Sequence, residues 1–159
     1  MRKAILIAIT IIALGYLCVA FFTLDGRSDD AKVRDFIASG IKAVQDRNVT
    51  AVISCISPDY NDDAGVNYDR LRILIAQAIK DEPGYLITTS KPSIKIRSNE
   101  ATVMLHVTLK HPAGVEFYDR DITLELAQQN AYHMLIIPTK QWQVVGTTNL
   151  GLCTAEESF

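Results

Sequence analysis

The feature that most constrains this chain is an uncharged run near its amino terminus. Arg2 and Lys3 are followed by 21 residues without a formal charge, Ala4 to Leu24. Because the hydrocarbon core of a bilayer is crossed by roughly 20 apolar residues in a helix, this run is long enough to span a membrane. We therefore expect residues 1–25 to form a transmembrane signal-anchor helix, with residues 4–24 inside the bilayer.

The charges on either side of the run predict its orientation. Positive residues tend to remain on the cytoplasmic side. Arg2 and Lys3 precede the run, whereas Asp25, Arg27, Asp29 and Asp30 follow it with a net charge of −2. We therefore expect a single-pass protein with a cytoplasmic N-terminus and an extracytoplasmic domain, which is periplasmic in a bacterium. A cleaved signal peptide is the alternative, although its apolar region is normally about 7–15 residues, shorter than this run.

The rest of the chain has the size and charge of one soluble domain. Residues 26–150 have a normal length for a domain with a single core, and residues 151–159 read as a loose tail. The whole chain carries 16 basic and 18 acidic residues, a net charge of −2, and its basic residues form no run. Nucleic-acid binding depends on clustered Lys and Arg, so the composition argues against a nucleic-acid partner.

The cysteines indicate neither a redox motif nor a zinc site. They stand at Cys18, Cys55 and Cys153, and no C-x-x-C spacing occurs. In an oxidising compartment Cys55 and Cys153 are able to pair, and two free thiols are the other interpretation. We expect no metal ion and no cofactor.

The first half of the domain has the periodicity of helices. Three are expected, over residues 28–47, 49–57 and 68–80. Ser28 is a suitable N-cap for the first of them. Pro58 ends the second, because the residue before a proline disfavours helical geometry.

From residue 93 the apolar period changes from 3.6 to 2, which is the period of a strand. Strands are expected over residues 93–97, 101–109, 116–126, 131–137 and 141–147. Turn residues separate them, at HPAG (111–114) and QQN (128–130), and short turns imply antiparallel pairing. Three helices followed by such strands predict an α+β domain with its helices on one face of a sheet.

Several local segments resemble a known family. The segments NVTAV (48–52) and ISPDYND (56–62), followed by Gly65, resemble nuclear transport factor 2-like domains, and QWQVV (141–145) resembles their last strand. The resemblance covers about residues 29–148. It implies the cone-shaped fold shared with polyketide cyclase-like proteins and ketosteroid isomerases, in which three helices and a curved, mostly antiparallel sheet enclose a pocket. This fold hosts enzymes, ligand binders and assembly subunits, so it does not define the function.

The first helix does not supply the catalytic residues that enzymes of this fold use. Catalytic members place a Tyr or His on that helix, or an Asp at the pocket mouth. The inward stripe here is apolar, consisting of Val33, Phe36, Ile37, Ile41 and Val44. An enolising enzyme needs a base within about 3 Å of the substrate proton and an oxyanion donor beside it. We therefore assign no catalytic residue and favour a non-catalytic role.

Four residues are expected to line the pocket, namely Tyr60, Tyr118, Arg120 and Trp142. By strand alternation Arg120 shares the apolar face of Tyr118 and Ile122, where a guanidinium is well suited to bind a carboxylate or phosphate. Three of them have a structural alternative. Arg120 can lay its stem along the core and keep its charge in water, Tyr60 can pack against the third helix, and Trp142 can belong to the core.

The other face of the same sheet offers a surface for a partner. Met104, His106 and Thr108 alternate onto this more polar face. The sequence thus predicts a membrane-tethered, non-catalytic binding or assembly module, an accessory subunit that contacts a membrane-protein partner outside the cytoplasm or a second copy of itself. The alternative is a pocket-based binder of small ligands, or an enzyme of the polyketide cyclase-like class.

Overall fold

The computed structural model describes residues 26–81, 86–133 and 137–151. The predicted anchor and residues 152–159 of the predicted tail lie outside these ranges. No helix within them is long and apolar enough to cross a membrane. The described chain forms two units, and the smaller one holds residues 26–27, 130–133 and 137–141. The core, the cavity and the candidate site described below lie within the larger unit.

Within the described ranges three helices precede the sheet, as the sequence predicts. They are α2 (Asp29–Gln45), α3 (Val49–Ser54) and α4 (Tyr68–Asp81). The predicted N-cap is confirmed, because the Ser28 hydroxyl oxygen accepts a hydrogen bond from the Ala31 amide. Asn48 caps α3 in the same way. These caps satisfy backbone amides that the first turn of a helix leaves unpaired.

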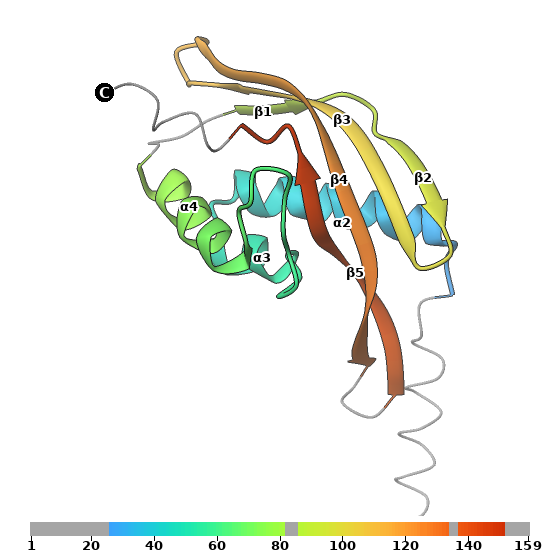
Figure 1. Ribbon diagram of the computed structural model, residues 1–159. Coiled ribbons are helices and arrows are strands. Elements are labelled where there is room, and N and C mark those ends of the chain that lie inside the picture. Colours follow the sequence, from blue (N-terminus) through green and yellow to red (C-terminus); the bar gives the residue numbers. More distant parts are fainter. Residues whose placement is uncertain (1–25, 82–85, 134–136, 152–159) are drawn as a thin grey trace, which may run out of the picture. The chain divides into compact units, whose positions relative to one another are not determined.

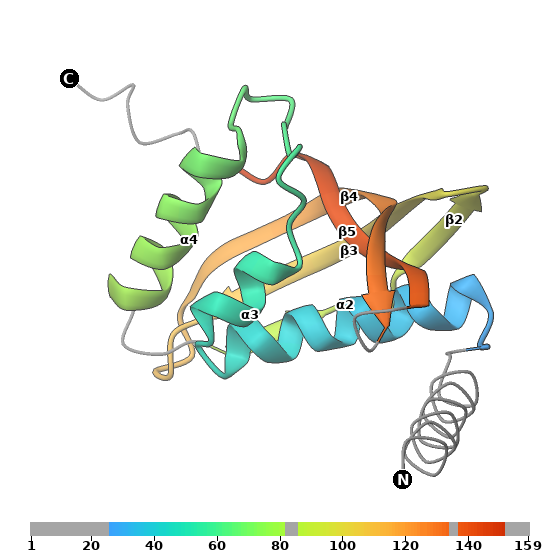
Figure 2. The same ribbon diagram turned by 90° about the horizontal axis from the view of Figure 1, so that it is seen from below.

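Five strands form one sheet. They are β1 (Leu86–Thr89), β2 (Ser93–Arg97), β3 (Glu100–Lys110), β4 (Glu116–His133) and β5 (Ile137–Thr148). The order is β1–β3–β4–β5, with β2 also paired to β3. The pairs that β3 makes with β1, β2 and β4 are antiparallel. Figures 1 and 2 show the helices on one side of this sheet, which confirms the predicted α+β arrangement.

Strand β1 was not predicted from the sequence pattern. It pairs with the same strand as β2, and the two are separated at Ser90, Lys91 and Pro92. Pro has no amide hydrogen to donate to the ladder. At this break the Ser90 hydroxyl oxygen accepts from the His106 amide over 2.9 Å, and the Ser90 amide donates to the His106 carbonyl. The backbone amide and carbonyl of His106 on β3 therefore remain hydrogen-bonded at the break.

The predicted turn at residues 128–130 is wrong. Strand β4 continues through Gln128, Gln129 and Asn130 to His133, so it joins the strand expected over residues 116–126 to the first part of the one expected over 131–137. Ile137 belongs to β5. The triplet is polar but contains neither Gly nor Pro, the residues that most effectively interrupt a strand. The Gln128 amide also donates to the carbonyl of Asn99 over 2.8 Å.

Helix α3 ends at Ser54 rather than at the predicted Ser57. The chain leaves the helix because Ile56 forms a parallel bridge with Val144 of β5. The amide of Ser57 then donates to the carbonyl of Val144 over 2.9 Å, and the amide of Asn61 donates to that of Val145 over 3.0 Å. The segment from residue 55 to 61 therefore runs along β5.

The main core lies between α2 and the sheet. Val33 and Val103 have no exposed surface, and Leu126 is 1% exposed. They pack with Ile37, Ala101, Leu105, Ile122 and Trp142. Truncating a buried aliphatic residue of this kind costs about 2–5 kcal/mol, so this layer fixes α2 against the sheet.

Candidate functional site

A cavity of about 490 Å³ lies between the three helices and the sheet. Ligand pockets typically enclose about 300–1,000 Å³. Helix α2 lines it with the predicted apolar stripe, from Phe36 to Val44, and α4 adds Leu71, Ile75 and Ala78. The sheet closes the opposite wall with Leu105, Val107, Ile122 and Leu124. The walls therefore come from segments that are far apart in the sequence.

Part of the cavity lining is exposed to solvent beside the turn between β3 and β4. Phe117 lines the cavity and is nonetheless 41% exposed. Its ring lies 4.4 Å from the His111 ring, centroid to centroid. Tyr118, the next residue, also lines the cavity and is half-buried. We take this end, at Phe117 and Tyr118, as the mouth.

No charged side chain is found among the described residues that line the cavity. These described lining residues contribute no carboxylate, imidazole, amine or guanidinium. Tyr60, Tyr118 and Cys55 are the larger polar groups on its walls. What the cavity can do chemically therefore depends on whether their polar atoms are available to a ligand.

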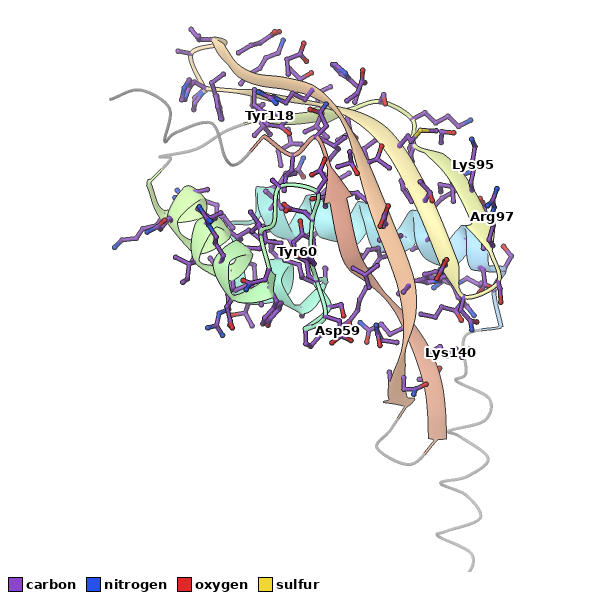
Figure 3. All side chains as sticks on the ribbon, in the orientation of Figure 1. Asp59, Tyr60, Lys95, Arg97, Tyr118 and Lys140 are labelled. Atoms are coloured by element: carbon purple, nitrogen blue, oxygen red, sulfur yellow. The ribbon has the colours of Figure 1, made fainter. Side chains whose placement is uncertain are left out.

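Tyr60, a predicted pocket residue, lines the cavity but has its hydroxyl engaged. Figure 3 shows Tyr60 in the segment between α3 and α4. Its hydroxyl lies 2.6 Å from the Thr147 hydroxyl and 3.4 Å from an Asp62 carboxylate oxygen. Burial is the main reason why the pKa of Tyr60 rises to about 12. A catalytic acid or base needs a pKa near the working pH, so Tyr60 is unsuited to proton transfer.

The other two polar groups are engaged as well. The Tyr118 hydroxyl donates to the carbonyl of Leu150 over 3.1 Å. The Cys55 thiol donates to the carbonyl of Ala51 over 3.3 Å, and burial raises the pKa of this thiol. Since these polar groups are paired within the protein, the cavity offers a ligand mainly apolar contacts.

Arg120 and Trp142 are not among the residues that line the cavity. Arg120 pairs with Val107 across the sheet, and its guanidinium lies 6.0 Å from the centroid of the Tyr118 ring. It therefore lies close to the cavity. Trp142 packs in the main core and is 4% exposed, and no described residue accepts a hydrogen bond from its indole nitrogen.

The predicted partner face carries a polar cluster that the sequence analysis did not identify. Register places His106 opposite Asp121 and Thr108 opposite Asp119. The two ring nitrogens of His106 lie 2.9 Å from Asp121 and 2.7 Å from Asp119. The Thr108 hydroxyl donates to Asp119 over 2.8 Å. Met104, two residues before His106, is 40% exposed.

The cluster favours a protonated imidazole. Hydrogen bonds to Asp121 and Asp119 raise the pKa of His106 above its ordinary value of 6.5. Hydrogen bonds from Thr108 and His106 lower the pKa of Asp119. Within the described residues, no group of three or more His, Cys, Asp or Glu side chains is arranged to hold a metal ion. We therefore interpret this cluster as cross-strand ion pairing on an exposed surface.

The fold resembles those of several solved structures. A cystatin-like protein of unknown function from Nostoc punctiforme aligns with a TM-score of 0.58 and 13% identity, over 75% of this chain and 87% of that one. A nuclear transport factor 2-like protein of unknown function from Pseudomonas putida aligns with a TM-score of 0.56 and 14% identity, over 77% of this chain and 87% of that one. A candidate scytalone dehydratase from Novosphingobium aromaticivorans aligns with a TM-score of 0.52 and 13% identity, over 75% of this chain and 80% of that one.

These likenesses show that the domain has the nuclear transport factor 2-like fold, as the sequence resemblance implied. At such identities they show the fold alone. No family model matches the chain, and no curated protein matches it.

We predict that His106 titrates at a higher pH than an ordinary histidine. Substituting Asp121 by Asn removes one carboxylate partner and lowers this midpoint, which NMR of the imidazole ring measures directly. Because the pKa is raised in the folded state, the contribution of His106 to stability is fully present below pH 6.5 and is lost as the pH rises through the folded pKa. A midpoint at or below 6.5 in the wild-type protein contradicts the geometry described here.

Proposed function

We propose that this protein is a non-catalytic binding module that holds an apolar small molecule in the cavity between its helices and its sheet. The observation that carries the proposal is the cavity itself, about 490 Å³ in volume, without a charged side chain among its described lining residues. Burying an unpaired polar group costs about 2–7 kcal/mol, so such a cavity discriminates against polar ligands. Each buried methylene contributes about 0.8 kcal/mol, and a chain of about eight carbons supplies about 6 kcal/mol.

The alternative of an enzyme lacks support from the lining. Dehydration or enolisation needs an acid or base within hydrogen-bond reach of the substrate. The ionisable groups on the described lining, Tyr60, Tyr118 and Cys55, all have raised pKa values. Each is also hydrogen-bonded within the protein. The likeness to a candidate scytalone dehydratase therefore extends to the fold without a matching acid–base pair.

Substituting Gly40 by Phe is expected to empty the cavity of its ligand. Gly40 lines the cavity from α2, and a Cβ added there meets no atom within 4 Å. Phe also has a better helix propensity than Gly, so the ring fills the space without destabilising the helix. The full-length protein is extracted from its membrane without detergent, and its apolar small molecules are quantified by mass spectrometry. We expect at least a tenfold loss relative to wild type.

The matched control is Ser39→Phe. Ser39 precedes Gly40 on α2 but is exposed, so the same ring is added on the solvent side and ligand content stays at the wild-type level. Equal amounts of the same molecule in wild type and Gly40→Phe contradict the proposed function.

We also propose that residues 1–25 tether the domain to a membrane and place it outside the cytoplasm. Support comes from the uncharged run Ala4–Leu24 and from the positive charges that precede it. A tethered domain meets apolar molecules where they are concentrated, at the bilayer.

Fusing residues 1–27 to alkaline phosphatase tests this orientation. We expect a membrane-bound and active fusion, because the phosphatase folds only outside the cytoplasm. Ile12→Arg places a charge in the middle of the run at a cost of about 2.5–3.5 kcal/mol, and should reduce membrane insertion. An inactive wild-type fusion contradicts the orientation, and an active fusion released from the membrane indicates a cleaved signal peptide.

We propose as a second function that the outer face of the sheet contacts a membrane-protein partner or a second copy of the chain, as an accessory subunit does. Met104 supports this role, because a large apolar side chain stands 40% exposed there beside the ordered cluster of His106, Asp119 and Asp121. An apolar centre bordered by polar groups is typical of a protein interface.

Substituting Met104 by Lys is expected to remove the associated protein. A charge at the centre of the interface opposes burial, so the co-purifying partner, or the dimer in sedimentation, should be lost. Ile73→Lys is the control, because Ile73 is 53% exposed on α4, away from this face. A Met104→Lys protein with an unchanged complex contradicts this role.

A further inference from the structure

Arg120 lies on the cavity side of the sheet. It pairs with Val107 of β3, and in its own strand it alternates with Tyr118 and Ile122; all three of these neighbours line the cavity. Arg120 itself is half-buried. Its guanidinium stands over the Tyr118 ring, 6.0 Å from the centroid, and Tyr118 marks the mouth.

The backbone of the segment after β5 leaves room for this guanidinium. A Cβ at Gly151 would lie 2.7 Å from the Arg120 Cζ atom. Gly151 has a φ of +69°, a conformation that side chains other than Gly rarely adopt. Leu150, the preceding residue, lines the cavity. The charge of Arg120 is therefore held against the cavity rim, between Tyr118 and the Leu150–Gly151 backbone.

No carboxylate within the described residues pairs with Arg120. Its neighbours in the strand, Asp119 and Asp121, point to the opposite face, where both contact His106. The guanidinium also contacts the face of the Tyr118 ring. A guanidinium stays charged at all physiological pH values and matches the geometry of carboxylate and phosphate oxygens. The cavity thus combines an apolar interior with a positive charge beside its mouth that no carboxylate of the described residues pairs.

We infer that the ligand is an anionic amphiphile, whose hydrocarbon part fills the cavity and whose carboxylate or phosphate head binds Arg120. This inference rests on the proposed function and specifies the chemistry of its ligand. The cavity interior, whose described lining has no charged group, accepts the hydrocarbon part of the ligand. The half-buried guanidinium at the rim forms charge-assisted hydrogen bonds with its anionic head. A neutral alcohol of the same chain length fills the cavity equally but gains little from Arg120.

A photoactivatable fatty acid and the fatty alcohol of the same chain, each carrying a diazirine, test this inference. Each is titrated into the full-length protein in phosphatidylcholine nanodiscs, and labelled peptides are identified by mass spectrometry. Wild type should label peptides of α2 and α4, with half-saturation by the acid at a concentration roughly tenfold lower than by the alcohol. Arg120→Gln should abolish this difference and leave labelling by the alcohol unchanged.

Lys95→Gln is the matched control for net charge. Lys95 is exposed on β2, as Figure 3 shows, and is not among the cavity residues. Its removal should leave the preference for the acid intact. Equal loss of the preference in Arg120→Gln and Lys95→Gln overturns the inference, because the effect is then one of overall charge.

Two further results separate this inference from the function on which it rests. If wild type labels the cavity equally with acid and alcohol, the role of Arg120 is overturned while apolar binding stands. If neither probe labels α2 or α4, both fail.

Discussion

The packing of α2 against the sheet is the contact on which the other features depend. One apolar stripe of this helix serves two purposes: Val33 packs in the main core, Val44 lines the cavity, and Ile37 does both. The contact with Val103 and Leu105 holds α2 at the sheet. Since α3 and α4 then cover the remaining part of the same sheet face, the space along the second half of α2 stays open as a cavity.

The sequence specified those elements whose local and tertiary preferences agree. The helices, the Ser28 cap and the alternating pattern of β3 were predicted because each repeats a clear period or capping signal. Strand β1 was missed because its four residues are ordered by pairing with β3 rather than by their own pattern. The polar residues at 128–130 were misread because pairing with neighbours keeps them extended, against their composition.

The sequence predicted a pocket between the helices and the sheet, but it predicted the residues of the candidate site only in part. Alternation placed Tyr118, Ile122 and Arg120 on one face, and the structure brings Tyr118 and Ile122 to the cavity with Arg120 at its rim. Trp142 lies in the core instead, because its place depends on how β5 packs rather than on its own strand pattern. The two carboxylates around His106 required the β3–β4 register, which a single sequence does not define.

The edges of the sheet have a consequence for how the protein behaves at high local concentration. One edge is divided into β1 and β2 by a segment that contains Pro92, and the β5 edge is occupied by the segment from residue 55 to 61, with Gly146 allowing Asn61 to approach closely. An uninterrupted free strand invites other chains to add to the sheet and start fibril growth. Within the described sheet one edge consists of two short strands, and the other is paired at Val144 and Val145. Both features work against amyloid-like growth at those positions when many copies crowd on one surface.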